Sequence, residues 1–306
     1  MKLPTLPWYL SFLSSFGLVA MAIRGEMAVF RSLPRVGPLF ATAYSDVVKP
    51  SVMGLEHYKN CLIVTASCFL VIRFLHTICC QGFKRQYYAL HVIVNSVVVY
   101  LTFYESINAL LYPSTSTVPA VGKANSHLYL CWICAIHVYH PIFFKTGVMD
   151  WIHHVPVYIL NICMFATLSA DVFYLQGIIM TGIPGGLDYL FLVMESEGVM
   201  KRSTYKGISA SINNWFRGPL GIISGYNCLL GVYWQWNEVG TNFQAGVFIF
   251  MGIHALYNPP FFGRQAIEAN IVDIINRYEM VGKQKGGIKL TDVRSKSGKD
   301  PERKTD

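Results

Sequence analysis

Long apolar segments separated by short polar connections follow one another along nearly the whole chain. Each is about as long as the roughly 20 helical residues that cross the hydrocarbon core of a bilayer. The pattern therefore predicts an all-α, polytopic membrane helical bundle with about eight transmembrane helices, or seven if the first span is not retained. The eight predicted spans lie near Thr5–Ile23, Asn60–Cys80, Tyr88–Leu111, His127–Phe144, Trp151–Leu168, Val172–Met194, Gly218–Trp234 and Phe243–Phe262.

Composition supports the same fold class. Apolar residues make up 53% of the 306 residues and charged residues only 14%, about half the charged fraction of a soluble domain. No soluble domain remains once the spans are removed. We therefore expect a transmembrane domain over residues 1–262 and a basic, cytosolic, largely disordered tail over residues 263–306.

The tail begins after Asn258, Pro259 and Pro260, which are expected to end the last transmembrane helix because proline lacks an N–H group and clashes with the preceding turn. Residues Gln265–Tyr278 carry isoleucines at helical spacing and predict a short amphipathic helix on the membrane surface. The final Arg303 and Lys304 resemble a dibasic endoplasmic reticulum retrieval signal, which acts from the cytosol.

The net charge of +8 follows membrane topology, so no nucleic-acid partner is expected. With a cytosolic N-terminus and eight alternating spans, most of the 25 lysines and arginines fall on the cytosolic side. Such a bias is typical of cytosolic loops and places both termini in the cytosol. The location predicted is the endoplasmic reticulum membrane, with membrane lipids as partners. The oligomeric state stays open.

All eight cysteines fall within or at the ends of predicted spans, which favours packing roles over a disulfide framework. Cys131 and Cys134 form a CxxC pair, but no second CxxC pair accompanies it. The sequence therefore predicts no metal site.

Ionisable residues inside a membrane are costly and usually face the interior of the bundle. In the third span His91, Asn95, Thr102 and Glu105 lie within an arc of about 80° on a helical wheel. Such a stripe indicates a polar or substrate-lined interior, and hydrogen bonding between helices is the alternative explanation. We assign His91, Asn95 and Glu105 as candidate substrate-binding residues.

Histidines concentrate in the next two spans. His137 and His140 are three residues apart and share one helical face, and His153 and His154 follow Asp150 after a short connection. A carboxylate that orients one imidazole would make another ring nitrogen available as a general base or nucleophile. Adjacent imidazoles project about 100° apart on a helix. We therefore expect His154 to face the interior and Asp150 to hold His153.

The sixth span contains Gly182–Gly186, with Pro184 in its centre, and should not form an ordinary continuous helix. Irregular backbone at membrane depth is tolerated where it lines a cavity. Asp188 follows at once, and Glu195 lies seven residues further on the same face. Asp188 is assigned as a candidate catalytic residue and Glu195 as a candidate binding residue.

The run Asp150-Trp151-Ile152-His153-His154, together with Tyr139, His140, Phe143 and Phe144 before it, resembles the core of the TLC domain. That domain is shared by ceramide synthases and the translocating-chain-associating membrane proteins. The resemblance covers about 60 residues and implies acyl transfer from acyl-CoA to a sphingoid amine. It implies catalytic roles for His153, His154, Asp150 and Asp188, with acyl-CoA as a co-substrate and no other cofactor.

Several alternatives remain open on the sequence. No histidine lies between His154 and His254, a departure from the ceramide synthases that favours a non-catalytic lipid-binding or lipid-regulating protein. The segment His137 to Pro141 resembles the His-x-x-His-His box of fatty acid elongases, with proline in place of its last histidine. A transporter that relays protons through His91, Glu105 and Asp188 is a further possibility.

Overall fold

The computed structural model describes residues 55–113, 116–117, 127–167, 170–234 and 242–284, and every regular element in these ranges is a helix. The all-α prediction is confirmed for this part of the chain. The first predicted span and the dibasic C-terminus lie outside the described residues.

The predicted spans within the described residues coincide with helices, and one span is a continuous run of three elements. The helices are α3 (Leu55–Cys79), α4 (Gln86–Leu111), α5 (Leu128–Phe143), α6 (Val148–Phe165), α7 (Asp171–Gly177), η2 (Ile178–Gly182), α8 (Ile183–Ser196), α9 (Arg202–Ile212), η3 (Asn213–Arg217), α10 (Gly218–Trp234) and α11 (Asn242–Gln284).

Four of these helical stretches are long and apolar enough to cross a membrane. They are His57–Cys79, Gln86–Leu111, Asp171–Ser196 and Ala245–Tyr278. Helix α5 is apolar but shorter. Large apolar side chains on α3, including Leu70, Phe74 and Ile78, are exposed, as expected of a helix whose outer face meets lipid. The described residues therefore indicate a membrane-embedded protein with four candidate spans, fewer than the eight predicted from the sequence.

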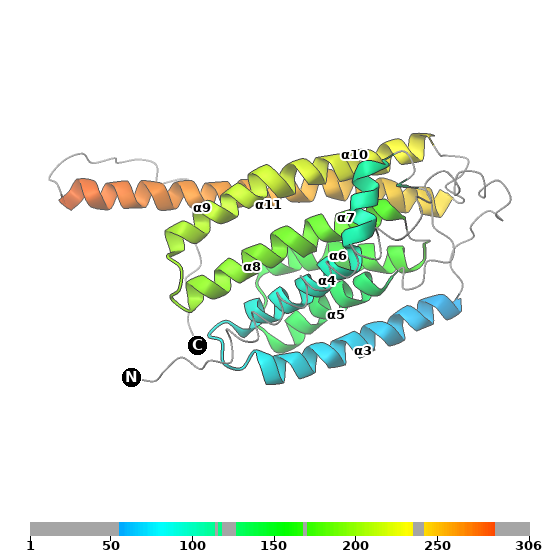
Figure 1. The fold of residues 1–306 in the computed structure, drawn as a ribbon, viewed down its shortest axis with the longest axis horizontal. Helices are drawn as coiled ribbons and strands as arrows, with labels where there is room; N and C mark the ends of the chain where they lie inside the picture. The colour runs from blue at the N-terminus through cyan, green and yellow to red at the C-terminus, as the bar shows by residue number, and fades with distance from the viewer. Residues whose placement is uncertain (1–54, 114–115, 118–126, 168–169, 235–241, 285–306) are drawn as a thin grey trace, which may run out of the picture.

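The helices lie roughly along a common axis, with α10 and α11 along one side and α3 along the other (Figure 1). Helix α4 packs against α5, α7 and α8, and α3 packs against α5. The loop before α4 contacts the loop after α8, because the Lys84 amide donates to Glu197 and its ammonium group donates to the Ser196 carbonyl. This end of the bundle therefore gathers the start of α4 and the end of α8.

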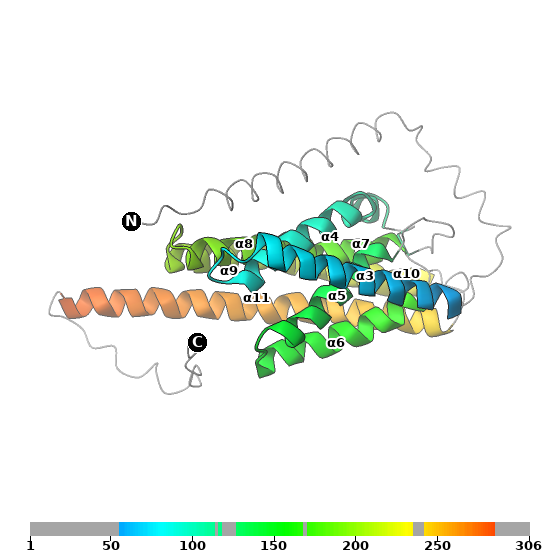
Figure 2. The same cartoon turned by 90° about the horizontal axis from the view of Figure 1, so that it is seen from below.

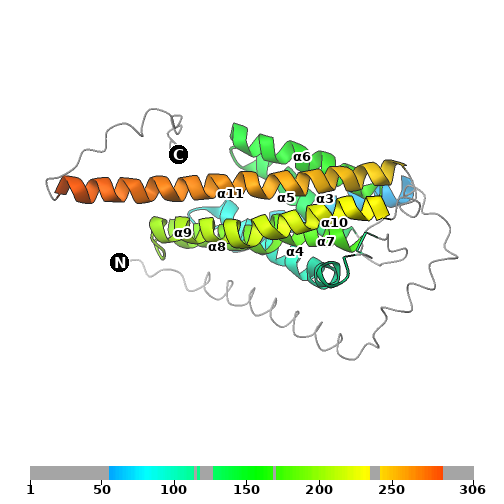
Figure 3. The same cartoon turned by 90° about the horizontal axis from the view of Figure 1, so that it is seen from above.

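Helix α11 continues through Pro259 and Pro260, so the expected break there is wrong. The predicted surface helix Gln265–Tyr278 is the second half of the same helix, which projects beyond most of the bundle (Figures 2 and 3). The proline turn packs closely against α10. A Cβ atom at Gly221 of α10 would collide with the Pro259 ring, so the absent side chain lets α10 lie directly against the proline turn.

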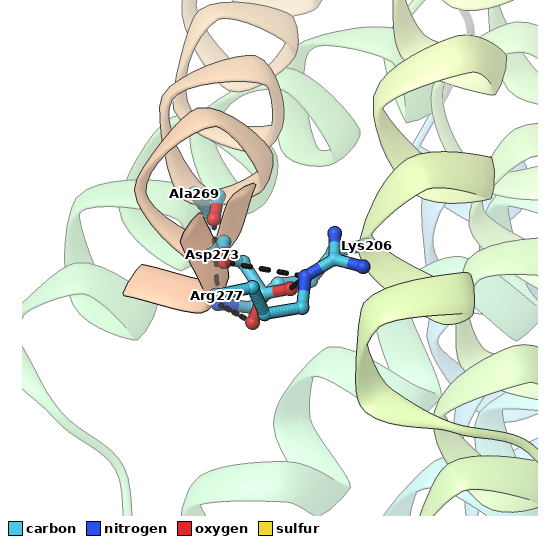
Figure 4. Close-up of polar contacts among 4 residues, drawn as sticks. All are labelled: Lys206, Ala269, Asp273 and Arg277. Atoms are coloured by element: carbon cyan, nitrogen blue, oxygen red, sulfur yellow. Dashed lines mark hydrogen bonds and ion pairs between the residues drawn. The ribbon is translucent and has the colours of Figure 1, made fainter. Parts of the chain in front are cut away.

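Helix α9 was missed by the sequence analysis, which treated residues 201–217 as a polar connection. It begins after Lys201 and runs through η3 into α10. Lys206 of α9 donates to the Ala269 carbonyl of α11 and pairs with Asp273 at 3.7 Å, while Arg277 pairs with the same carboxylate (Figure 4). Polar contacts to α11 thus stabilise a helix that has too few apolar residues to be recognised as a span.

The contact between α10 and α11 yields a stability prediction. A Cβ atom at Gly225 would lie 2.8 Å from the Gly252 carbonyl oxygen and 2.8 Å from Leu256 Cγ, so Gly225→Ala must push the two helices apart. We expect a loss of about 1–3 kcal/mol in unfolding free energy. The matched control is Gly246→Ala, where a Cβ atom meets nothing within 4 Å. Equal stability of the two variants in a detergent unfolding titration would contradict this packing.

Candidate functional site

Five histidines meet between α4, α5 and α6, near the end of the bundle where α5 ends and α6 begins. This five-histidine cluster consists of His91, His137, His140, His153 and His154. His137 Nε2 lies 3.3 Å from His153 Nε2, and His140 Nδ1 lies 3.3 Å from His154 Nε2. The His91 ring centroid lies 6.5 Å from those of both α5 histidines. The structure therefore brings together all five histidines that the sequence singled out.

Local helix geometry explains this convergence. His137 and His140 are three residues apart, so both project from one face of α5. A short connection at residues 144–147 then returns the chain into α6 alongside. The Tyr158 hydroxyl, one turn after His154, donates to the His137 carbonyl oxygen at 2.7 Å and holds α6 against α5.

Hydrogen bonding assigns the proton positions of one pair. His137 Nδ1 lies 2.7 Å from the Ile133 carbonyl oxygen, which can only accept, so Nδ1 carries the proton and Nε2 presents a lone pair. His153 Nε2 must then donate to it, which leaves the lone pair of His153 on Nδ1. That nitrogen is buried and makes no hydrogen bond within the described residues. His153 therefore offers an unprotonated nitrogen inside the protein.

The two α6 histidines face different neighbours, although both reach an α5 imidazole. His153 also contacts the Phe262 ring of α11, and His154 contacts the Tyr158 ring. Each of them has an α5 histidine opposite it, so both take part in the cluster. His154 is the more buried of the two side chains, with 3% of its surface exposed, whereas His153 is partly exposed.

Two tyrosines form an aromatic wall beside the cluster. Tyr87 stacks on His140 with ring centroids 3.9 Å apart, and Tyr189 of α8 stacks on His91 at 4.3 Å. Their hydroxyl oxygens lie 3.3 Å apart. This wall holds the α4 and α5 imidazoles in place and adds two phenolic groups that can donate protons.

Asp150 does not hold His153 as the sequence predicted. Its carboxylate accepts the Gly147 N–H at 2.7 Å, which is the bond of an acidic residue that caps the start of a helix. The carboxylate is still close enough to interact electrostatically with His140 and His154. Asp150 thus fixes the beginning of α6 and places a negative charge near the cluster.

The predicted stripe on α4 extends well beyond the cluster. Thr102 donates to the Val98 carbonyl of its own helix at 2.7 Å. Glu105 lies 14 residues after His91, or about 21 Å along the helix, so it belongs to the opposite end of the bundle. Glu105 is therefore not part of the histidine site, in contrast to the single site expected from the helical wheel.

Asn95 lies one turn after His91, against the start of α8. Cβ atoms at Gly185 and Gly186 would lie 3.2 Å from Asn95 Nδ2 and 3.3 Å from Asn95 Cβ, so the two glycines permit this approach. Both polar atoms of the Asn95 amide are buried and make no hydrogen bond within the described residues. A buried amide of this kind can recognise a carbonyl or hydroxyl group of a ligand.

The predicted irregularity before Asp188 is present as a π-helical segment, η2, which ends at Gly182. Pro184 follows in the first turn of α8 and cannot donate to the Met180 carbonyl. Arg217 supplies a donor to that oxygen instead, with Nη2 at 3.3 Å, and its Nη1 donates to Asn213 at 3.0 Å. Arg217 thus joins η2 to the second π-helical segment, η3.

The two acidic residues of α8 have different surroundings. Asp188 interacts electrostatically with Arg217, and its buried Oδ1 makes no hydrogen bond within the described residues. Asp188 immediately precedes the Tyr189 that stacks on His91, so it lies beside the cluster rather than in it. Glu195 lies seven residues further, about 10 Å along the helix, and is therefore more distant from the cluster than Asp188.

A small, partly open cavity of about 50 Å³ lies between α5, α6, α7, η2 and α11. Most of its lining is apolar, including Leu130, Ile133, Val157, Leu160, Phe173 and Met180. Asn161, Gln176 and His254 also line it, and each has a buried polar atom without a hydrogen bond in the described residues. An apolar cavity with a few convergent polar groups is typical of a ligand site.

Four residues of this region were missed by the sequence analysis: Tyr87, Tyr189, Arg217 and His254. Tyr87 had a usable signal, because it lies four residues before His91 and so on the same helical face. Arg217 was counted among the cytosolic basic residues, since nothing in its local sequence indicates contact with η2. His254 was noted only for its distance from His154 along the chain.

Comparisons with protein-family models, curated proteins and solved structures gave no match to this chain. The resemblance to the TLC domain therefore stands on the residues quoted for it. Function has to be argued from the geometry of the site.

Two substitutions of Asp150 separate its hydrogen bond to Gly147 from its negative charge. Asp150→Asn keeps an oxygen that accepts the Gly147 N–H, whereas Asp150→Ala removes it, so only the alanine variant should lose about 1 kcal/mol of stability. Unfolding of both variants in detergent measures the difference. Equal stability of the asparagine and alanine variants would contradict the cap.

Arg217 provides a second test of the site's framework. Arg217→Gln leaves the Met180 carbonyl without its guanidinium donor in a partly buried position, and we expect a loss of about 1–3 kcal/mol. Arg264→Gln is the matched control, because Arg264 is 80% exposed and, among the described residues, pairs with Glu268 of its own helix. Unfolding of the two variants should differ clearly. A stable Arg217→Gln protein would show that this bond does not hold η2 to η3.

Proposed function

We propose that this chain is a multi-pass membrane enzyme of lipid metabolism that transfers an acyl group from acyl-CoA at the five-histidine cluster. In this proposal the chain forms a TLC-like bundle of eight spans in the endoplasmic reticulum, with both termini in the cytosol. One observation carries the proposal: five imidazoles from three helices meet inside an apolar bundle, and one of them presents an unprotonated, unpaired nitrogen.

His153 Nδ1 is suited to act as the general base. It would take a proton from the acceptor amine as the amine nitrogen attacks the thioester carbonyl carbon. The carbon–sulfur bond then breaks, and the thiolate of coenzyme A leaves and takes up the proton from the imidazolium. His137 stabilises that imidazolium, because its Nε2 accepts from His153 Nε2 and its own Nδ1 is bonded to the Ile133 carbonyl.

The neighbouring groups supply the remaining needs of acyl transfer. The Tyr87 and Tyr189 hydroxyls and the Asn95 amide can donate to the oxyanion that develops on the thioester carbonyl. The apolar cavity beside His254 suits part of a hydrocarbon chain. Lys84 and Lys201 flank this end of the bundle, where basic side chains favour the phosphates of acyl-CoA.

A non-catalytic lipid-binding protein is the second candidate. The hydrogen bond of Asp150 favours this function. The Asp150 carboxylate accepts the Gly147 N–H and caps α6, whereas the carboxylate of a catalytic dyad would orient an imidazole. The same apolar cavity and unpaired amides would then recognise a lipid without changing it.

The test is acyl transfer by purified protein supplied with long-chain acyl-CoA and a sphingoid amine. We expect coenzyme A release and an N-acylated product, and we expect His153→Gln and His154→Gln each to lower the rate at least about 100-fold. His76→Gln is the matched control, because His76 is also a buried histidine but bonds to Tyr139 and Gln86 outside the cluster.

All variants are compared at matched monodispersity in detergent. Binding of the lipids without coenzyme A release in the wild-type protein would favour the lipid-binding function. Full activity in both α6 variants would show that the cluster does not carry the reaction.

A further inference from the structure

Two His-x-x-x-Cys pairs face each other at the opposite end of the bundle from the five-histidine cluster. The first pair begins α3 and the second begins α5, and together they form the His/Cys group: His57, Cys61, His127 and Cys131. In each pair the residues are four apart, so both side chains project from one helical face. His127 lies ten residues before His137 on α5, about 15 Å along the helix.

Three ligand atoms of the group converge. His57 Nε2 lies 3.2 Å from His127 Nδ1 and 3.4 Å from Cys61 Sγ, and all three atoms lie within 4.8 Å of one another. A tetrahedron built on ordinary zinc bond lengths has nitrogen–nitrogen edges of about 3.3 Å and nitrogen–sulfur edges of about 3.6 Å. The two shortest separations therefore match the edges of a tetrahedral zinc site.

The fourth member, Cys131, lies next to Cys61. Cys131 Sγ lies 3.5 Å from the Cys61 carbonyl oxygen, and its thiol interacts with the Cys61 thiol. A rotation of the Cys131 side chain from the carbonyl toward the imidazoles would complete a set of two sulfur and two nitrogen ligands. Tetrahedral sites of this composition are typical of zinc.

His127 is already held in the tautomer that a metal requires. Its Nε2 lies 3.1 Å from the Met164 carbonyl oxygen and 3.0 Å from that of Thr167. Carbonyl oxygens only accept, so Nε2 carries the proton and Nδ1 directs its lone pair at the centre of the group. A ligating histidine commonly donates its other ring N–H to a backbone carbonyl in this way.

The charge balance suits a buried position. Zinc binding releases one proton from each of the two thiols, and the resulting site of Zn²⁺, two thiolates and two neutral imidazoles carries no net charge. A neutral site avoids the cost of an uncompensated charge in an apolar environment. Cys61 and Cys131 are 5% and 2% exposed, whereas His57 is partly exposed at the beginning of α3 and offers the ion a path from solvent.

We propose that the His/Cys group binds one Zn²⁺ ion that joins α3 to α5. The bonds from His127 to the Met164 and Thr167 carbonyls extend this link to the end of α6. The ion stabilises the end of the bundle remote from the five-histidine cluster. Its role is structural, and the site is separate from the proposed acyl transfer.

The first experiment measures zinc by mass spectrometry in full-length protein, purified with a tag free of histidine from cells supplied with zinc. We expect about one ion per chain, and loss of most of it in Cys61→Ser and in Cys131→Ser. Cys134→Ser and Cys228→Ser are the controls, because these cysteines lie outside the group. Unchanged zinc content in both ligand variants would overturn the proposal.

A second measurement identifies the ligand atoms in the wild-type protein, and a double variant then separates this group from the five-histidine cluster. Co²⁺ in place of zinc in the wild-type protein should give visible bands of tetrahedral cobalt and a sulfur-to-cobalt charge-transfer band. A His137→Ala, His154→Ala protein should keep both. Cobalt bound without the charge-transfer band, or lost in that double variant, would place the metal on the histidine cluster and overturn the proposal.

Discussion

Polar atoms buried between membrane helices must find partners within the protein, because the apolar core of a bilayer offers none. This constraint accounts for several of the polar contacts within the bundle. His137 uses the Ile133 carbonyl and His153, Arg217 uses Asn213 and the Met180 carbonyl, and His127 uses two carbonyls at the end of α6. The few atoms left without partners then mark the places where a ligand can bind.

Several of those unpaired atoms lie at the five-histidine cluster or at the cavity between α5, α6, α7, η2 and α11. His153 Nδ1 and the Asn95 amide lie at the five-histidine cluster, and Asn161, Gln176 and His254 contribute unpaired atoms to the adjoining cavity. The apolar side chains between them favour a hydrocarbon ligand over a polar one. A reactive polar end and an apolar interior are what acyl transfer to a lipid requires.

The helices and the convergence of the histidines were predictable because both depend on local patterns. Apolar windows located the helices, and the three-residue spacing of His137 and His140 placed them on one face. Contacts between distant helices were not predictable from such patterns. Gly221 lets α10 pack on Pro259 of α11, a helix that is continuous where the local sequence predicted a break. Glu105 shares a helical face with His91, but the wheel does not show their separation along the axis.

The His/Cys group was missed for the same reason, since its halves lie 70 residues apart and neither is a recognised motif alone.

The central claim is that the interior of the bundle, beside the histidines, binds an acyl chain. Photo-crosslinking with an acyl-CoA that carries a photoreactive group on its chain, followed by peptide mapping, tests it most directly. The account predicts labelling of the cavity residues Leu160, Phe173 and Met180, and loss of the label when unmodified acyl-CoA competes. Labelling confined to the exposed α3 residues Leu70, Phe74 and Ile78, without competition, would contradict it.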